Sequence, residues 1–163
     1  MTAVAAIRTF IEGRLDRWNG LPAIRASELV DSLGQPVQRE EVTLGAYPAL
    51  RLTFAVPDRA ATLHAYERGG QVVMVERSPP PDITAMESLP EPSAVMPQEV
   101  HIDQSYAHEV LYCERGLLLT IAEPLDGSGR KRLVRCRGIR PLPPTARTPG
   151  ADLYIPLDAR IKW

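Results

Sequence analysis

The sequence has little of several features that usually identify a function. Its 163 residues include two cysteines, 6% aromatic residues and a formal net charge of -1 at pH 7. Two cysteines exclude the disulfide-rich class of small secreted domains. A net charge near zero excludes recruitment of nucleic acid by overall basicity, and the scarcity of aromatic rings argues against single-strand binding by stacking. The remaining composition is that of an ordinary globular chain.

The sequence also has no long hydrophobic run, so no transmembrane span is expected. Arg8, Glu12 and Arg14 interrupt the N-terminal segment, which therefore does not have the apolar stretch of a secretory signal peptide. We accordingly expect a cytoplasmic protein without a membrane partner.

Motifs that carry catalytic chemistry are scarce too. Residues 127–129 (Gly-Ser-Gly) are too short for a phosphate-binding loop and do not form a nucleophile elbow, so a hairpin turn explains them better. His101, Asp103 and His108 come closest to a metal-ligand set, but the two histidines have opposite parity and would point to opposite faces of a strand. We therefore expect no cofactor and no metal. A small-ligand- or metal-using enzyme centred on residues 101–115 is kept as an alternative function.

Hydrophobic periodicity predicts both helices and strands. Apolar residues spaced by three and four predict a helix over residues 3–18 and a short second helix over 27–33. Strands are predicted at residues 50–56, 72–75, 106–114, 117–122 and 131–139, and a further short helix at 83–89. Cys113 and Cys136 fall within predicted strands, either as two small buried hydrophobic residues or as a disulfide between neighbouring strands.

A proline run divides the chain. Three successive prolines at 79–81 cannot donate to a sheet and favour an extended backbone. We expect residues 1–78 to form the N-terminal helix and a first α+β half, and residues 83–163 a second half with a Pro-rich C-terminal segment, unless the two are fused into one domain.

Two segments resemble each other across this break. Residues 29–36 (LVDSLGQP) and 85–92 (AMESLPEP) share Ser, Leu and the final Pro at equivalent positions, which indicates an internal repeat. The expected fold is therefore α+β, with two similar halves that each pack a short helix or helices on an antiparallel sheet.

A short helix ending in Leu-x-x-Pro, followed by Tyr-led antiparallel strands, resembles the unit of the β-lactamase-inhibitor-protein and outer-membrane-lipoprotein (SmpA/OmlA) type. The residues that carry the resemblance are Leu33, Gly34, Pro36, Tyr47, Leu89, Pro92, Tyr106, Gly116 and Leu117. The resemblance implies a helical hairpin on a curved antiparallel sheet, sometimes in tandem, with a sheet face suited to protein binding. The sequence has no lipobox cysteine, export signal or disulfide framework, so exported inhibition and membrane assembly are not carried over.

The sharpest local feature is a run of basic residues near the C-terminal end. Between positions 130 and 140, six residues are cationic and none is acidic: Arg130, Lys131, Arg132, Arg135, Arg137 and Arg140. Such a run is typical of a solvated hairpin whose Arg stems lie on the sheet, or of a patch that docks an acidic partner protein. A nucleic-acid binder that uses this strand is a further alternative, and the run contains no aromatic residue for stacking.

The leading functional hypothesis is a non-enzymatic protein-binding module that uses this basic patch. An immunity or inhibitor protein of a bacterial toxin system exemplifies the class. The hypothesis depends on the charged strand and on the scarcity of catalytic motifs.

Overall fold

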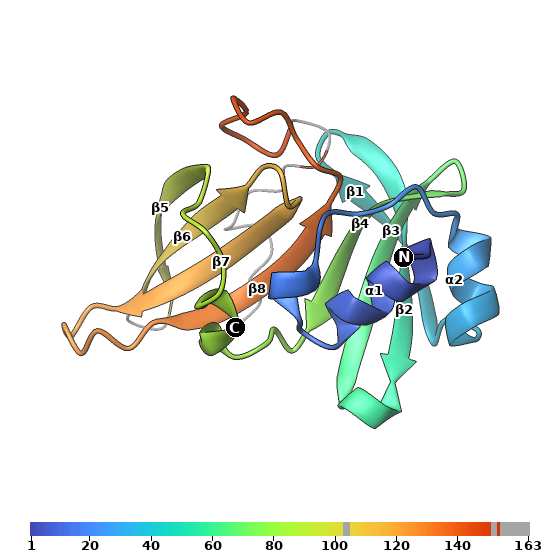
Figure 1. The fold of residues 1–163 in the computed structure, drawn as a ribbon, viewed down its shortest axis with the longest axis horizontal. Coiled ribbons are helices and arrows are strands. Elements are labelled where there is room, and N and C mark those ends of the chain that lie inside the picture. Colours follow the sequence, from blue (N-terminus) through green and yellow to red (C-terminus); the bar gives the residue numbers. More distant parts are fainter. Residues whose placement is uncertain (103–104, 151–152, 154–163) are drawn as a thin grey trace.

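The computed structural model describes residues 1–102, 105–150 and 153, with the backbone alone described for residues 97–102. Its centre is one sheet of antiparallel strands in the order β1-β2-β3-β4-β8-β7-β6-β5 (Figure 1). The strands are β1 (Gln38–Leu44), β2 (Tyr47–Val56), β3 (Ala61–Arg68), β4 (Gln71–Ser78), β5 (Ala94–Ile102), β6 (Ser105–Tyr112), β7 (Leu117–Pro124) and β8 (Arg132–Ile139). The helices are α1 (Ala3–Ile11) and α2 (Ala26–Leu33), with single 3-10 turns η1 (Leu15–Arg17), η2 (Pro57–Arg59) and η3 (Ile83–Met86).

Each half of the chain contributes four consecutive strands that pair with their neighbours along the sequence. The two sets meet where β4 pairs antiparallel with β8, with Met74 opposite Ile139 and Val75 opposite Gly138. This register places β8 in the middle of the sheet, between β4 and β7. A strand in that position is paired along both edges. Solvent can therefore reach its side chains only where a face of the sheet is uncovered.

The expected fold of two similar helix-on-sheet halves is wrong. Both α-helices of the described residues belong to the first half, and residues 83–89 form only the 3-10 turn η3. Prolines at 79–81 and at positions 90 and 92 flank that turn and leave no room for a helix of more than about two turns. Ile83, Ala85, Met86 and Leu89 still pack against the same core as the helices. A single open sheet, covered on one face by one helical layer, replaces the predicted pair.

Helix α1 covers the junction between the two sets of strands (Figure 1). Thr2 caps the helix, because its Oγ1 accepts a hydrogen bond from the Ala5 N–H at 3.1 Å. The helix ends at Ile11 rather than near residue 18, since Gly13 takes a positive φ of 75° and the chain continues as η1. The Nε of Arg77, on β4, donates to the Ile11 carbonyl at 2.7 Å and fixes this end of α1 to the sheet.

Trp18 anchors the same segment to the second set of strands. It is fully buried, and its indole N–H donates to the Gly116 carbonyl at 3.2 Å. The ring lies where the backbone of β8 comes closest, because a Cβ added at Gly138 would be 2.7 Å from Trp18 Cζ2. Glycine at 138 is therefore required for the indole to come this close to the backbone of β8.

Hydrophobic residues cover both faces of the sheet. On the helix face, α1, α2 and Trp18 pack against side chains from both sets of strands, including Phe54 and Leu119. The opposite face, which we call the back face, has a second cluster that includes Leu44, Met74, Ile139 and Leu153. Cys136 lies in the first cluster and Cys113 in the second, and both are free thiols. Burial raises the pKa of the Cys136 thiol to about 12, so it behaves as a small apolar side chain.

Candidate functional site: the basic strand β8

The six predicted patch residues do not form one surface. Arg130, Lys131 and Arg132 are exposed at the hairpin that joins β7 to β8. Arg140 is also exposed, but it follows the other end of β8, about 25 Å away along an eight-residue strand. Arg135 is largely buried and Arg137 is completely buried, so the structure assigns these two residues to the interior of the back face.

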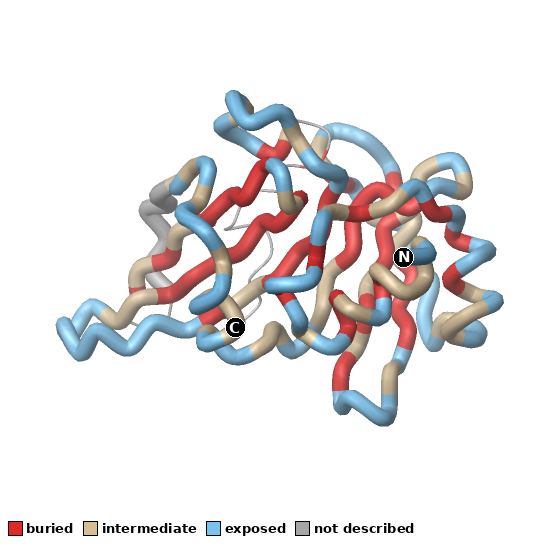
Figure 2. The backbone as a smooth tube through the Cα atoms, in the orientation of Figure 1, coloured by how far each residue is buried: buried red, intermediate tan, exposed pale blue. Residues whose placement is uncertain are grey.

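The exposed end of this hairpin, residues 125–132, projects beyond the body of the sheet, and every one of these residues is exposed (Figures 1 and 2). Local hydrogen bonds shape it: the Ser128 N–H donates to Asp126 Oδ1 at 2.8 Å, and the Lys131 N–H donates to the Gly129 carbonyl at 3.0 Å. Among the described residues, none of the three cations at this hairpin end takes part in an ion pair. Their charges are therefore available to a partner.

Arg137 is bound inside the protein. Its Nη2 lies 2.7 Å from Glu109 Oε1 and also donates to Thr120 Oγ1 at 3.2 Å. The Arg137 and Glu109 side chains are each only 1% exposed. Glu109 lies on β6 and Thr120 on β7, so this contact joins three strands of the second set. A buried guanidinium needs such a partner, because an unpaired charge in the interior carries a large desolvation cost.

Arg135 joins the two sets of strands. Its Nε donates to Glu76 Oε2 on β4 at 2.6 Å, and the Tyr66 hydroxyl on β3 donates to the other Glu76 oxygen at 3.3 Å. Burial alone would raise the pKa of Glu76, but the charges of Arg135 and Arg137 hold it below its ordinary value. The carboxylate is therefore ionised and paired at neutral pH.

These pairs belong to a charged row that crosses the back face from β1 to β6. The row consists of Glu40, Arg51, His64, Tyr66, Glu76, Arg135, Arg137 and Glu109. Glu40 pairs with Arg51 near the β1 edge, and the Nδ1 of His64 is 3.1 Å from Thr53 Oγ1. Burial lowers the pKa of His64, which favours the neutral ring.

Several buried atoms of the row have no hydrogen-bond partner within the part of the chain that the structure describes: Arg51 Nε, Glu109 Oε2, Arg135 Nη1 and Arg137 Nε. Buried polar atoms of this kind are usually satisfied by internal water. The row is therefore an internal part of the sheet and not a docking surface, and it contains the two arginines that the sequence had placed in the patch.

The alternative site around residues 101–115 is only partly described. Asp103 and the side chain of His101 lie outside the described residues, and His108 has the same parity as Val110 of the helix-face core. Burial and the nearby Lys131 lower the pKa of His108, while Glu123 raises it. Among the described residues, no group of three or more His, Cys, Asp or Glu side chains could hold a metal ion.

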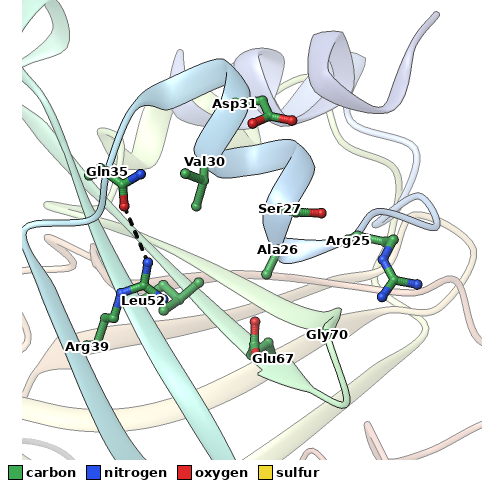
Figure 3. Close-up of a pocket in the computed structure, with 10 residues that line it drawn as sticks. All are labelled: Arg25, Ala26, Ser27, Val30, Asp31, Gln35, Arg39, Leu52, Glu67 and Gly70. Atoms are coloured by element: carbon green, nitrogen blue, oxygen red, sulfur yellow. Dashed lines mark hydrogen bonds between the residues drawn. The ribbon is translucent and has the colours of Figure 1, made fainter.

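Sequence reasoning missed a pocket of about 370 Å³ between α2 and the sheet (Figure 3). Its lining is formed by Arg25, Ala26, Ser27, Val30, Asp31, Gln35, Arg39, Leu52, Glu67 and Gly70. These residues are scattered over 46 positions of the sequence and share no motif, so only the folded chain brings them together. The sequence predicted the helix over 27–33 and a turn at the double glycine 69–70, but not that the two lie side by side.

No helix in the described ranges is long and apolar enough to cross a membrane. Comparison with known proteins gives no relative: no family model, no curated protein and no solved structure matches this chain. The resemblance to the β-lactamase-inhibitor-protein type therefore stays a prediction. The chain's function has to be argued from its own geometry.

Proposed function

We propose that the protein is a non-enzymatic binding module that docks an acidic partner protein through the exposed end of the β7–β8 hairpin. The observation that carries the proposal is the position of Arg130, Lys131 and Arg132, three consecutive exposed cations without an ion pair among the described residues. A cluster of one sign attracts a partner of the opposite sign and raises the rate of association.

The interior half of the same strand supports this role. Arg135 and Arg137 bind Glu76 and Glu109, so β8 is fixed to β4 and, across β7, to β6. A rigid strand presents its exposed end in one orientation, and less conformational entropy is lost when a partner binds. The basic run therefore combines a fixed inner part with a free outer part.

Immunity and inhibitor proteins of bacterial toxin systems act by binding alone, and we propose this class for the chain. A small, firmly packed scaffold with a projecting charged hairpin suits such a protein, because it needs a rigid complementary surface and no reaction centre.

The test is retention of a partner by the immobilised full chain, offered the products of the genes next to its own. The tip variant, Lys131→Glu with Arg132→Glu, is compared with the wild type. We expect the wild type to retain an acidic protein, and this retention should weaken as the salt concentration rises. The tip variant should bind the same protein with an affinity that is lower by about tenfold or more.

The matched control is Arg17→Glu with Arg140→Glu, which changes the net charge equally at two exposed sites away from the hairpin. It should retain the partner like the wild type. Retention of nucleic acid instead of protein, or equal retention by the tip variant, would overturn the proposal.

A further inference from the structure

The pocket between α2 and the sheet is built from two firmly connected walls. Helix α2 forms one wall, and its first N–H, at Ala26, donates to the Gly70 carbonyl of the β3–β4 turn at 2.9 Å. The backbone of Arg25 also forms an isolated antiparallel β-bridge with that of Gln71, so the start of the helix is connected to that turn. The volume of about 370 Å³ lies within the range of pockets that bind small molecules.

Glycine at position 70 sets the place of Arg25. A Cβ at Gly70 would lie 3.2 Å from the Arg25 Nη2, so the guanidinium lies directly against the bare backbone of the turn. A side chain at this position would require a small shift of the Arg25 guanidinium, and the positive φ of 83° at Gly70 disfavours one more strongly.

Glu67 faces the helix side of the sheet through the ordinary alternation of β3, because it has the same parity as Leu63 and Ala65 of the helix-face core. The register between β3 and β4 shifts beside it, but the extra residue, Val73, lies on β4. Figure 3 shows the Glu67 carboxylate pointing from the strand into the space below α2. Among the described residues, this carboxylate has no ion pair and no hydrogen bond.

Arg39 lies on the opposite side of the same pocket. It comes from the edge strand β1, and its Nη2 lies 3.5 Å from Gln35 Oε1, which holds the guanidinium at the pocket wall (Figure 3). Arg39 pairs with Leu52 and Leu52 with Ala65, so Arg39 and Glu67 stand two strand spacings apart on one face of the sheet, at about 12 Å between Cα atoms. That separation leaves opposite charges facing one pocket without a direct contact.

Apolar side chains lie between these charges. The half-buried Val30 lines the pocket from the helix, and the buried Ala26 and Leu52 lie below it (Figure 3). The lining carries two acidic side chains, Asp31 and Glu67, against two arginines. A balanced lining does not select a simple anion or cation, whereas a molecule with both charges satisfies both ends.

We propose that this pocket binds a small zwitterion, either a free α-amino acid or a dipeptide, with an apolar side chain. The ligand's ammonium group pairs with Glu67, its carboxylate with Arg39 and Gln35, and its side chain contacts Val30. Charge-assisted hydrogen bonds at both ends give orientation, and the apolar contact with Val30 adds affinity. The site is separate from the β7–β8 hairpin, so it stands independently of the proposed protein docking.

The test is a titration of the isotope-labelled full chain, followed by backbone amide NMR, with leucine and with leucyl-leucine up to about 10 mM, which detects dissociation constants in the millimolar range. N-acetyl-leucine and leucinamide serve as matched probes, because each removes one of the two ligand charges. We expect shifts at Ser27, Gln35 and Gly70 with leucine, the dipeptide or both, and at least tenfold weaker binding of the two blocked probes. Binding of leucine alone identifies a free amino acid as the ligand, and binding of the dipeptide alone identifies a peptide.

Variants assign the two ends. Glu67→Gln should weaken leucine binding until it is no tighter than that of N-acetyl-leucine to the wild type, and Arg39→Gln until it is no tighter than that of leucinamide to the wild type. The exposed Glu41→Gln, on the same strand as Arg39 and outside the pocket lining, is the control and should bind like the wild type. No shift with either zwitterion, or equal binding of the blocked probes, overturns the proposal, and neither result depends on whether a variant folds.

Discussion

The Nη2 of Arg137 lies 2.7 Å from Oε1 of Glu109, and both side chains are almost completely buried. Arg137 lies on β8 and Glu109 on β6, and β7 runs between these two strands. The ion pair therefore reaches across β7. It lies on the back face, where the Thr120 hydroxyl of β7 accepts a second hydrogen bond from the same guanidinium nitrogen. A residue of the basic run thus connects strands of the fold.

Removal of one partner of this pair should destabilise the protein strongly. Arg137→Met leaves the Glu109 charge buried and unpaired, and Glu109→Leu does the same to Arg137, at a cost of about 3–5 kcal/mol each. Chemical denaturation measures the free energy of unfolding. The double variant should cost less than either single one, because apolar side chains of similar volume replace a buried pair with little loss.

The exposed pair of Arg14 and Asp16 gives the control. Arg14→Met should change the free energy of unfolding by less than about 1 kcal/mol, since water and salt screen such a pair. Additive losses in the Arg137 and Glu109 double variant would show that the pair does not act as a unit.

Stability should fall when the pH drops from about 7.5 to 5.5. Burial lowers the pKa of His64, an effect that Glu76 opposes and that Arg51 and Arg135 reinforce, so the folded value lies below the ordinary value of about 6.5. The unfolded chain therefore takes up a proton at His64 before the folded chain does, and acid favours unfolding across this window. The same direction holds for His108, whose pKa is also lowered by burial.

His64→Asn should make the slope of unfolding free energy against pH shallower between pH 7.5 and 5.5, whatever its effect on stability at a single pH. The His64→Asn, His108→Asn double variant should flatten it further. An unchanged slope in the double variant would mean that neither histidine has a depressed pKa in the folded protein.

The charge of Lys131 at the hairpin should have a measurable effect on the pKa of His108. Its positive charge is one of the causes that lower the pKa of His108, so Lys131→Glu should raise that pKa. NMR titration of the His108 ring measures the shift. Arg140→Glu, at the far end of β8, should leave the pKa unchanged, and equal shifts in both variants would place Lys131 away from His108.

Gly138 should not tolerate a side chain. Its Cβ would lie 2.7 Å from Trp18, 3.0 Å from Val75 and 3.2 Å from Phe10, so Gly138→Ala should cost about 1–3 kcal/mol by overpacking. The indole causes the closest of these contacts, so the cost should be smaller in a Trp18→Phe background. Gly34→Ala, which has no atom within 4 Å, should cost the same in both backgrounds. Equal costs for Gly138→Ala in both would contradict the contact.

The sequence predicted individual strands better than their assembly. Alternation at residues 50–56 and apolar runs at 72–75 and 117–122 correspond to β2, β4 and β7, because period and burial are local properties. The pairing of β4 with β8 joins residues about sixty positions apart, and no local pattern encodes it. The predicted second helical half failed for a related reason: α1 and Trp18 of the first half cover strands of both sets.

The division of the basic run could not be read from the sequence either. Strand alternation places Arg135 and Arg137 on the same face of β8. A charged face indicates exposure to solvent only where one face of the sheet is uncovered. Strand β8 is central, and both of its faces are covered. Glu76 and Glu109, the partners that draw the two arginines inside, lie on strands far away in the sequence. Arg130, Lys131 and Arg132 differ because the hairpin carries them beyond the sheet.

The most direct test of the split between the exposed hairpin cations and the buried arginines compares two variants. Each variant is measured for its free energy of unfolding and for its affinity for the partner. The variant with Lys131→Glu and Arg132→Glu should have a free energy of unfolding within about 0.5 kcal/mol of the wild-type value. It should bind the acidic partner about tenfold more weakly. Arg137→Met should lose stability while its folded fraction binds like the wild type. Undiminished binding by the variant with both hairpin substitutions, in a stably folded protein, would contradict the proposed docking surface.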